Sequence, residues 1–328
     1  MTLSTTFQHK QDTFVTIATE ATVGTIATND ATRINMPVTD YSFDNPFKHS
    51  LMEAPKRSGG VGAVLSDEMV KWNKHDRMFE VSLTFMATAE SLNRVCLNLF
   101  EDGTNELKIL GSMPTTNKLT DGESNAQAVT ITIENAHHTG TDISFISCLC
   151  NSLTISGSIN DNAGVYMCTA TFVTGYIPNV ADKAYSGGTE TTVAAQTNYF
   201  NIHDLTTSTL DGEDVLVYGF DVNITKTVNR IGFDSSANFK PIGYAMGEIS
   251  VTGNITVKRD GESVAAIDNE AGMILILDDG TFKIQGDKVF VGETGISMDD
   301  DGWKDNIPLV FTYDSANTTN ALIEIHTA

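Results

Sequence analysis

The longest hydrophobic pattern in the chain runs from Asp142 to Gly175, where apolar residues alternate with small polar ones. A period of two residues is typical of a β-strand that buries one face and leaves the other free. Residues 160–164 (NDNAG) carry turn chemistry, and the alternation resumes at Tyr166. The stretch therefore predicts a long β-hairpin with a Ser/Thr face. Its first apolar set is Ile143, Phe145, Leu149, Leu153, Ile155 and Ile159.

The same pattern occurs a second time. Leu216–Asn229 and Glu248–Val257 both alternate, and a loop rich in Ser, Asn, Pro and Gly, Asp234–Gly243, lies between them. Two long hairpins of one design predict a duplicated β-sandwich unit. We expect further strands at Pro37–Phe47, Glu80–Phe85, Val129–Glu134, Met273–Leu277, Val289–Val291, Pro308–Tyr313 and Ala321–His326.

One helix is predicted at Ala89–Glu101, with Thr88 as its N-cap and Gly103 after its end. Its apolar stripe is Leu92, Val95, Cys96 and Leu99, at helical spacing.

A constant offset of 172 residues supports the duplication, because Leu83-Thr84-Phe85 before Glu90-Ser91 matches Ile255-Thr256-Val257 before Glu262-Ser263. The offset predicts a shorter, weaker second helix at about Glu262–Glu270.

A chain of 328 residues is too long for one ordinary core and suits two domains. We expect an N-terminal arm over residues 1–37, which are rich in Thr and Ala, and a first domain over 38–177. Residues 178–205 have the small-residue composition of a linker, and 206–328 form the second domain.

Charge excludes one class of function. Lys plus Arg number 20 against 42 Asp plus Glu, a formal charge of −22, whereas a protein that grips nucleic acid needs basic surface. The N-terminus lacks the pattern of a signal peptide, and no apolar run is long enough to span a bilayer. We therefore expect Cys96, Cys148, Cys150 and Cys168 to be buried thiols.

Candidate chemistry is sparse. His137-His138 near Cys148-x-Cys150 is a weak zinc pattern, and two buried thiols explain the cysteines better. Residues 297–308 around Asp299-Asp300-Asp301-Gly302 lack the ligands of a calcium loop. No nucleophile elbow or metalloprotease motif is present, so we expect no enzyme, no metal and no cofactor. A carboxylate pair for glycoside hydrolysis, drawn from distant strands, stays open.

The chain resembles the bacteriophage major tail-tube proteins, of the type whose subunit carries two tail-tube domains. The resemblance rests on Ala21–Phe43, an arm entering a first strand, and on the strand–helix segment Phe79–Phe100. It also rests on the Ser/Thr-faced hairpins that end in Cys168–Gly175 and Ile249–Thr256.

This resemblance implies a mainly β fold with two tandem tail-tube-type β-sandwich or barrel domains, each with a flanking α-helix and long hairpins. Three subunits would form a pseudo-six-fold ring, and stacked rings would form a hollow tube with an acidic lumen that DNA crosses without specific binding. The implied partners are further copies of the chain and the tape-measure, tail-tip or baseplate and tail-terminator proteins. The implied location is the virion tail, after synthesis in the bacterial cytoplasm, without membrane insertion.

Two sets of residues follow from the resemblance. The hairpins would supply the tube wall through Leu153, Ile155, Phe172, Val222, Ile224, Ile249, Val251 and Ile255. The loops Gly111–Gln127 and Asp234–Gly243, with the N-terminal arm, would supply the ring-to-ring contacts. The candidate residues in the loops are Thr116, Asn117, Lys118, Asp121, Glu123, Asn238 and Lys240.

Two alternatives remain at this stage. One is a phage adhesin, decoration or receptor-binding β-sandwich module, and the other is an acidic glycan-active enzyme. The chain has only two tryptophans, Trp72 and Trp303, and neither lies in an aromatic cluster, which weakens the sugar-binding versions.

Overall fold

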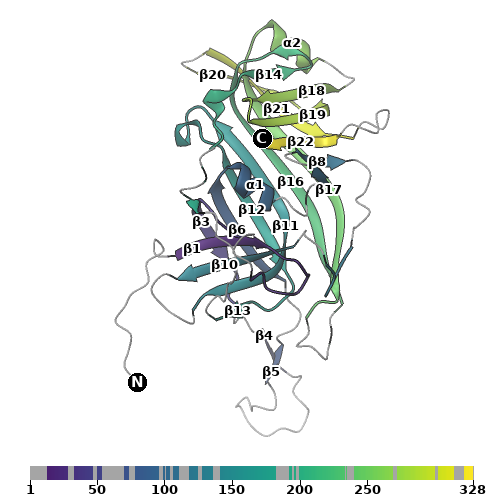
Figure 1. Ribbon diagram of the computed structural model, residues 1–328. Coiled ribbons are helices and arrows are strands. Elements are labelled where there is room, and N and C mark those ends of the chain that lie inside the picture. The colour runs from purple at the N-terminus through teal and green to yellow at the C-terminus, as the bar shows by residue number, and fades with distance from the viewer. Residues whose placement is uncertain are drawn as a thin grey trace, which may run out of the picture.

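A computed structural model shows a mainly β protein built around one large antiparallel sheet (Figure 1). The structure describes residues 13–28, 33–46, 50–53, 70–73, 78–95, 99, 101–103, 106–110, 118–124, 128–135, 141–181, 192–193, 196, 199–232, 234, 240–268, 272–299, 302–313 and 321–327.

Eight strands pair side by side to form what we call the central sheet. Their order is β3 (Val38–Phe43), β6 (Phe79–Met86), β12 (Met167–Thr174), β11 (Ile143–Ser158), β16 (Val217–Ile231), β17 (Gly243–Lys258), β21 (Gly302–Phe311) and β20 (Gly295–Asp299). Every neighbouring pair is antiparallel. The β11–β16 junction, which we call the seam, joins the two halves of the chain in this sheet.

Two groups of further strands, one in each half of the chain, cover the core side of the central sheet. In the first half they are β1 (Thr13–Thr19), β2 (Arg33–Asn35), β10 (Val129–Asn135) and β13 (Asn179–Val180). In the second half they are β14 (Thr207–Leu210), β15 (Glu213–Asp214), β18 (Met273–Asp278), β19 (Phe282–Val291) and β22 (Ala321–Thr327). Figure 1 shows β16 and β17 running diagonally past both groups.

Strand pairing recurs in the same order in both halves. In the first half, β2 pairs with β1, β1 with β10, β10 with β11, and β11 with β12 and β13. In the second half, β15 pairs with β14, β14 with β18, β18 with β19, and β19 with β21 and β22. Thus β19 and β20 together correspond to the single long strand β11.

Three further segments have no counterpart strands in the other half among the described residues. They are β4 (Ser50–Glu53) with β5 (Val70–Asn73), β7 (Glu101–Gly103) with β8 (Glu106–Leu110), and β9 (Lys118–Thr120). Two short 3-10 helices, η4 (Asn162–Gly164) and η6 (Ile202–Asp204), lie beside the seam.

Both helices lie where the 172-residue offset places them. The first, α1, spans Ala89–Val95, and the second, α2, spans Gly261–Ile267. Thr88 Oγ1 accepts a 3.1 Å hydrogen bond from the Ser91 amide, and Asp260 Oδ1 accepts a 3.0 Å bond from the Ser263 amide.

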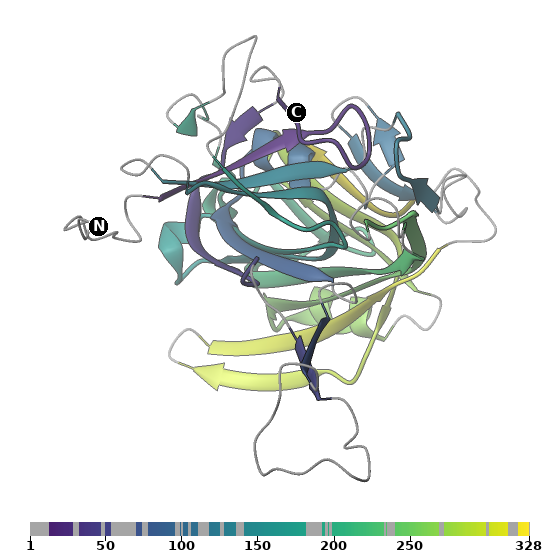
Figure 2. The same cartoon turned by 90° about the horizontal axis from the view of Figure 1, so that it is seen from below.

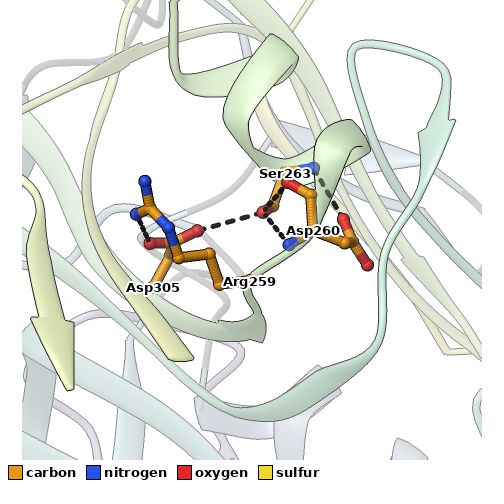
Figure 3. Close-up of polar contacts among 4 residues, drawn as sticks. All are labelled: Arg259, Asp260, Ser263 and Asp305. Atoms are coloured by element: carbon orange, nitrogen blue, oxygen red, sulfur yellow. Dashed lines mark hydrogen bonds and ion pairs between the residues drawn. The ribbon is translucent and has the colours of Figure 1, made fainter. Parts of the chain in front are cut away.

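In each cap the serine hydroxyl oxygen accepts a hydrogen bond from the backbone amide of the capping residue. The amide of Thr88 donates to Ser91 Oγ, and that of Asp260 donates to Ser263 Oγ, both at 3.0 Å. These reciprocal bonds satisfy donors that a helix start otherwise leaves free. Figure 3 shows the second of these caps.

One hydrophobic cluster runs through both halves. At the seam, the ring centroid of Tyr166 lies 5.0 Å from that of Phe220 and 5.3 Å from that of Phe282. Phe200 stacks on Phe282 at 4.4 Å. The two halves therefore share a core as well as a sheet.

Several predicted elements are confirmed. They are the hairpins β11–β12 and β16–β17, the strands β3, β6, β10, β18, β19, β21 and β22, and the N-cap at Thr88.

The helix predictions were wrong in extent. Helix α1 ends at Val95 rather than Glu101, and Gly103 lies in strand β7. The second helix, which the sequence predicted to be shorter and weaker, has the same length as the first, seven residues. Cys96 lies outside the described residues.

Two segments that the sequence placed outside the domains are packed into the fold. From Thr13 on, the expected arm of residues 1–37 contains β1, whose Val15 and Ile17 are buried. The expected linker, 178–205, contains β13, η6 and the buried Phe200. Strand β1 pairs with β10 and β2, and its Val15 and Ile17 pack into the hydrophobic cluster, which explains the first case.

Candidate functional site

The free side of the central sheet carries ordered rows of polar side chains, and we call it the polar face. Its side chains form rows across the strands because paired residues share a side of the sheet. One row is Ser42, Ser82, Thr171, Ser152, Thr225 and Ser250. The next is Asp40, Thr84, Thr169, Thr154, Asn223, Thr252 and Val310.

Hydroxyl and amide groups on the polar face bond to one another between neighbouring strands. Thr154 Oγ1 donates to Asn223 Oδ1 across the seam at 3.2 Å. Asn254 Nδ2 donates to Asn306 Oδ1 at 2.7 Å, from β17 to β21. The polar face is thus cross-linked by its own side chains.

Charged side chains are a minority on the polar face, which is mainly hydroxyl and amide, and they have both signs: Glu80 shares the side of Ser82, and Lys258 and Lys304 lie in the row of Ser297. The acidic lumen implied by the resemblance is therefore not a property of this surface, although Asp40 and Asp221 lie on it. Partial burial raises the pKa of Asp221. The buried Lys304 places its ammonium 4.1 Å from the centre of the Tyr218 ring.

A pocket of about 650 Å³ opens at one end of the polar face, beside the seam. It is lined by polar residues of both halves, among them Ser156, Asp161, Asp221, Asn254 and Ser297. Asn254 Oδ1 is buried without a hydrogen-bond partner.

The two edges of the central sheet are β3 and β20. Within the described part of the chain, β3 pairs in this sheet with β6 alone, and β20 pairs with β21 alone. Next to the β20 edge, three large apolar side chains are exposed: Ile296 at 55%, Met298 at 69% and Trp303 at 56%. We call them the apolar patch. In Figure 2 the hairpin that carries them, drawn in yellow-green, forms one margin of the molecule.

The predicted ring-to-ring residues come together in part. Lys240 Nζ lies 2.5 Å from Asp121 Oδ2, so the two loops meet in an ion pair. Bonding to Asp121 raises the pKa of Lys240. Glu123 accepts a 2.9 Å bond from the Thr120 amide, and Lys118 begins β9, which pairs with β17. Thr116, Asn117 and Asn238 lie outside the described residues.

Behind this ion pair lies a buried polar cluster that sequence reasoning missed. Glu20 Oε1 accepts bonds from the Ser147 amide and Thr130 Oγ1, both at 2.7 Å, and Oε2 accepts one from Ser147 Oγ at 2.6 Å. Burial raises the pKa of Glu20. Ser147 has a φ of 50° within β11, so Glu20 holds a left-handed backbone turn where this strand passes between the two layers.

Two tyrosines, Tyr176 and Tyr244, pack beside the ion pair with their ring centroids 6.2 Å apart. Tyr176 donates its hydroxyl to Asp121 Oδ1 at 2.8 Å, and Tyr244 accepts a 2.9 Å bond from the Gly175 amide. Burial is the main cause that raises the pKa of both phenols. The sequence around Glu20 could not predict this cluster, because its partners Thr130 and Ser147 lie more than a hundred residues away along the chain.

The predicted wall residues all lie on the core side of the central sheet rather than on its free side. Leu153, Ile155, Phe172, Val222, Ile224, Val251 and Ile255 are buried, and Ile249 is partly buried. They pack in the hydrophobic core behind the central sheet.

The cysteines described are buried thiols: Cys148, Cys150 and Cys168. Burial raises the pKa of Cys150 to about 12. Among the residues whose positions are described, no group of three or more His, Cys, Asp or Glu side chains is arranged to bind a metal ion. His137 and His138 lie outside that part of the chain.

The carboxylate of Asp305, on β21 next to the edge strand β20, has two side-chain partners. It is buried, bonds to Arg259 Nη1 at 2.5 Å, and accepts a 3.0 Å bond from Ser263 Oγ. Figure 3 shows the carboxylate between these two groups, where it ties the start of α2 to β21.

Across the described residues, no helix combines the length and apolar character needed to cross a membrane. No protein-family model matches the chain, and no curated protein is significantly similar to it in sequence.

Proposed function

We propose that this protein is a structural subunit of a bacteriophage tail tube, and that it self-assembles into rings that stack into a hollow tube. One observation carries the proposal. A single antiparallel sheet continues through both halves of the chain, has a bare polar face, and ends in two strand edges that have no second partner among the described residues.

Physical chemistry favours closure of such a sheet. Exposed strand edges invite pairing with other chains, and a closed ring removes them. Because β3 and β20 are different edges, the contact between copies is heterologous, and a rotation that closes gives a ring. In the proposed assembly, two tandem tail-tube-type domains per chain and three chains per ring give pseudo-six-fold symmetry.

The polar face lines the bore in this proposal. Binding to DNA phosphates requires cationic groups that displace counterions, and a surface of hydroxyl and amide groups supplies few of them. DNA therefore passes without specific binding. The formal charge of −22 keeps the assembled tube soluble in this proposal.

Ring-to-ring contact is assigned to the region around the Asp121–Lys240 ion pair, which lies at the end of β17 away from α2. The proposed partners are other copies of the chain, with tape-measure, tail-tip or baseplate and tail-terminator proteins along and at the ends of the tube. The proposed location is the virion tail, and no catalytic role is assigned.

A phage adhesin, decoration or receptor-binding module is the second candidate. The pocket of about 650 Å³ beside the seam favours it, since convergent polar groups around a concave site are typical of ligand binding. This function predicts discrete particles that bind a soluble carbohydrate or peptide ligand.

Negative-stain electron microscopy of purified, concentrated protein tests the proposal. Rings or hollow tubes of uniform width are expected without any partner protein. Small uniform particles at every concentration, unchanged by an added tail-tip complex, would refute it and favour the second candidate.

A further inference from the structure

The seam inside one chain provides a template for the contact between two chains. Because strand pairing recurs in both halves, β16 corresponds to β3, and β20 corresponds to the last part of β11. The seam joins β11 to β16, whereas β20 and β3 lie at opposite edges of the central sheet. A second copy of the chain can therefore repeat the seam by placing its β3 edge beside β20.

The correspondence of β3 with β16 holds residue by residue. Thr84 and Thr256 lie 172 residues apart, and they pair with Asp40 and Gly219, respectively. Both strands shift register just before these residues, between Val38 and Asp40 and between Val217 and Gly219. Tyr41, Ser42 and Phe43 then correspond to Phe220, Asp221 and Val222.

The correspondence of β20 with β11 is equally direct. Ser156 pairs with Met167, which lies opposite Met86 on β6. Ser297 pairs with Lys304, which lies opposite Lys258 on β17, 172 residues after Met86. Ile296, Ser297 and Met298 thus correspond to Ile155, Ser156 and Gly157.

We infer that β20 of one copy pairs antiparallel with β3 of the next copy, in the register that the seam shows. In the seam, Ile155 lies opposite Val222, Ser156 opposite Asp221 and Gly157 opposite Phe220. Between copies, Ile296 lies opposite Phe43, Ser297 opposite Ser42 and Met298 opposite Tyr41. This inference rests on the proposed function and names the residues of the contact that closes the ring.

The burial of side chains supports a second copy as the occupant of this edge. At the seam, Ile155 and Tyr166 are fully buried, whereas the corresponding residues Ile296 and Trp303 are 55% and 56% exposed. Pairing with β3 brings Tyr41 and Phe43 over the apolar patch. Phe43, itself 36% exposed, is part of the same contact from the other side.

Polar groups on the free face stay solvated in this arrangement. Ser297 and Ser42 lie side by side on the polar face, as Ser156 and Asp221 do at the seam. The hydroxyl rows thus continue from one copy to the next.

Cysteine pairing across the contact tests the register. In a Cys96→Ser background, Ser42→Cys protein is mixed with Ser297→Cys protein and oxidised. Neighbouring strands lie about 4.8 Å apart, so these two thiols can reach disulfide geometry. Ser82→Cys mixed with Ser297→Cys is the matched control, because Ser82 lies in the same row one strand farther away.

The register predicts disulfide-linked dimers in the first mixture at least about tenfold above the control and above either protein alone. If rings or tubes form but the first mixture does not exceed the control, the register is wrong while the proposed function stands. Cross-linked dimers without rings or tubes would support edge pairing and refute the tube. Neither cross-links nor assemblies would refute both.

A second pair of variants tests the apolar patch. Ile296→Asp leaves a folded subunit, since the side chain is already exposed, but abolishes assembly. Ile274→Asp is the control, because Ile274 is 45% exposed on the outer strand β18 and lies outside the contact. Wild-type assembly by Ile296→Asp would overturn the inference.

Discussion

Gly157 makes the seam possible, and adding one methyl group there tests the packing of the two halves. A Cβ built at this position lies 2.6 Å from Tyr166 Cδ1 and 2.8 Å from Phe220 Cε1, well inside contact distance. Both rings are buried and pack edge-to-face, so neither can move without opening the core. Overpacking of this kind costs about 1–3 kcal/mol, and we expect Gly157→Ala to lower the free energy of unfolding by that amount.

The assay is urea unfolding of the unassembled subunit, followed by tyrosine and tryptophan fluorescence. Gly295→Ala is the matched control, because Gly295 also lies in a strand of the central sheet and its Cβ meets nothing closer than Asn306 Cβ at 3.8 Å. We expect the control to lie within about 0.5 kcal/mol of the wild type. If Gly157→Ala were as stable as the control, the described packing at the seam would be wrong.

Three further predictions concern other parts of the subunit. Because the folded state raises the pKa of Glu20, its contribution to stability is full below its unfolded value of about 4.5 and is lost as the pH rises through the folded pKa. The stability of the wild type relative to Glu20→Gln should therefore decrease from pH 4.5 to 7 in urea titrations; a constant difference would contradict this. Ser91→Ala and Ser263→Ala should each lower the free energy of unfolding by about 1–3 kcal/mol, because each leaves the amide of the capping residue, Thr88 or Asp260, without its side-chain acceptor. Equality of either variant with the wild type would contradict the cap geometry. Lys240→Ala should change stability by less than about 1 kcal/mol, since its ion pair with Asp121 is partly exposed, yet shorten tubes in electron micrographs; unchanged tube length would remove this region from the stacking contact.

Local patterns predicted much of the strand content of this fold. The alternation in β11, β16 and β17 identified which side of each strand is buried, because a pleated strand points successive side chains to opposite sides. The 172-residue offset predicted the position of α2. Its Val264 is exposed, whereas the corresponding Leu92 of α1 is fully buried. The spacing of the repeat predicted this helix, whereas a hydrophobic pattern did not.

Long-range pairing could not be predicted in the same way. Lys118–Thr120 reads as loop in isolation and forms a strand because β17 lies beside it, where Leu119 becomes fully buried. Strand β1, which lies in a Thr-rich stretch, likewise depends on β10, more than a hundred residues away. No local pattern indicates that β11 pairs with β16, which is the contact that makes one sheet of two halves.

Cryo-electron microscopy of the assembled protein tests the central claim most directly. The account predicts a hollow ring of three 35.4 kDa chains with six similar wall segments, in which the central sheet closes through β20 and β3 and the polar face lines the bore. A ring of six chains, or a bore lined by any other surface, would contradict it.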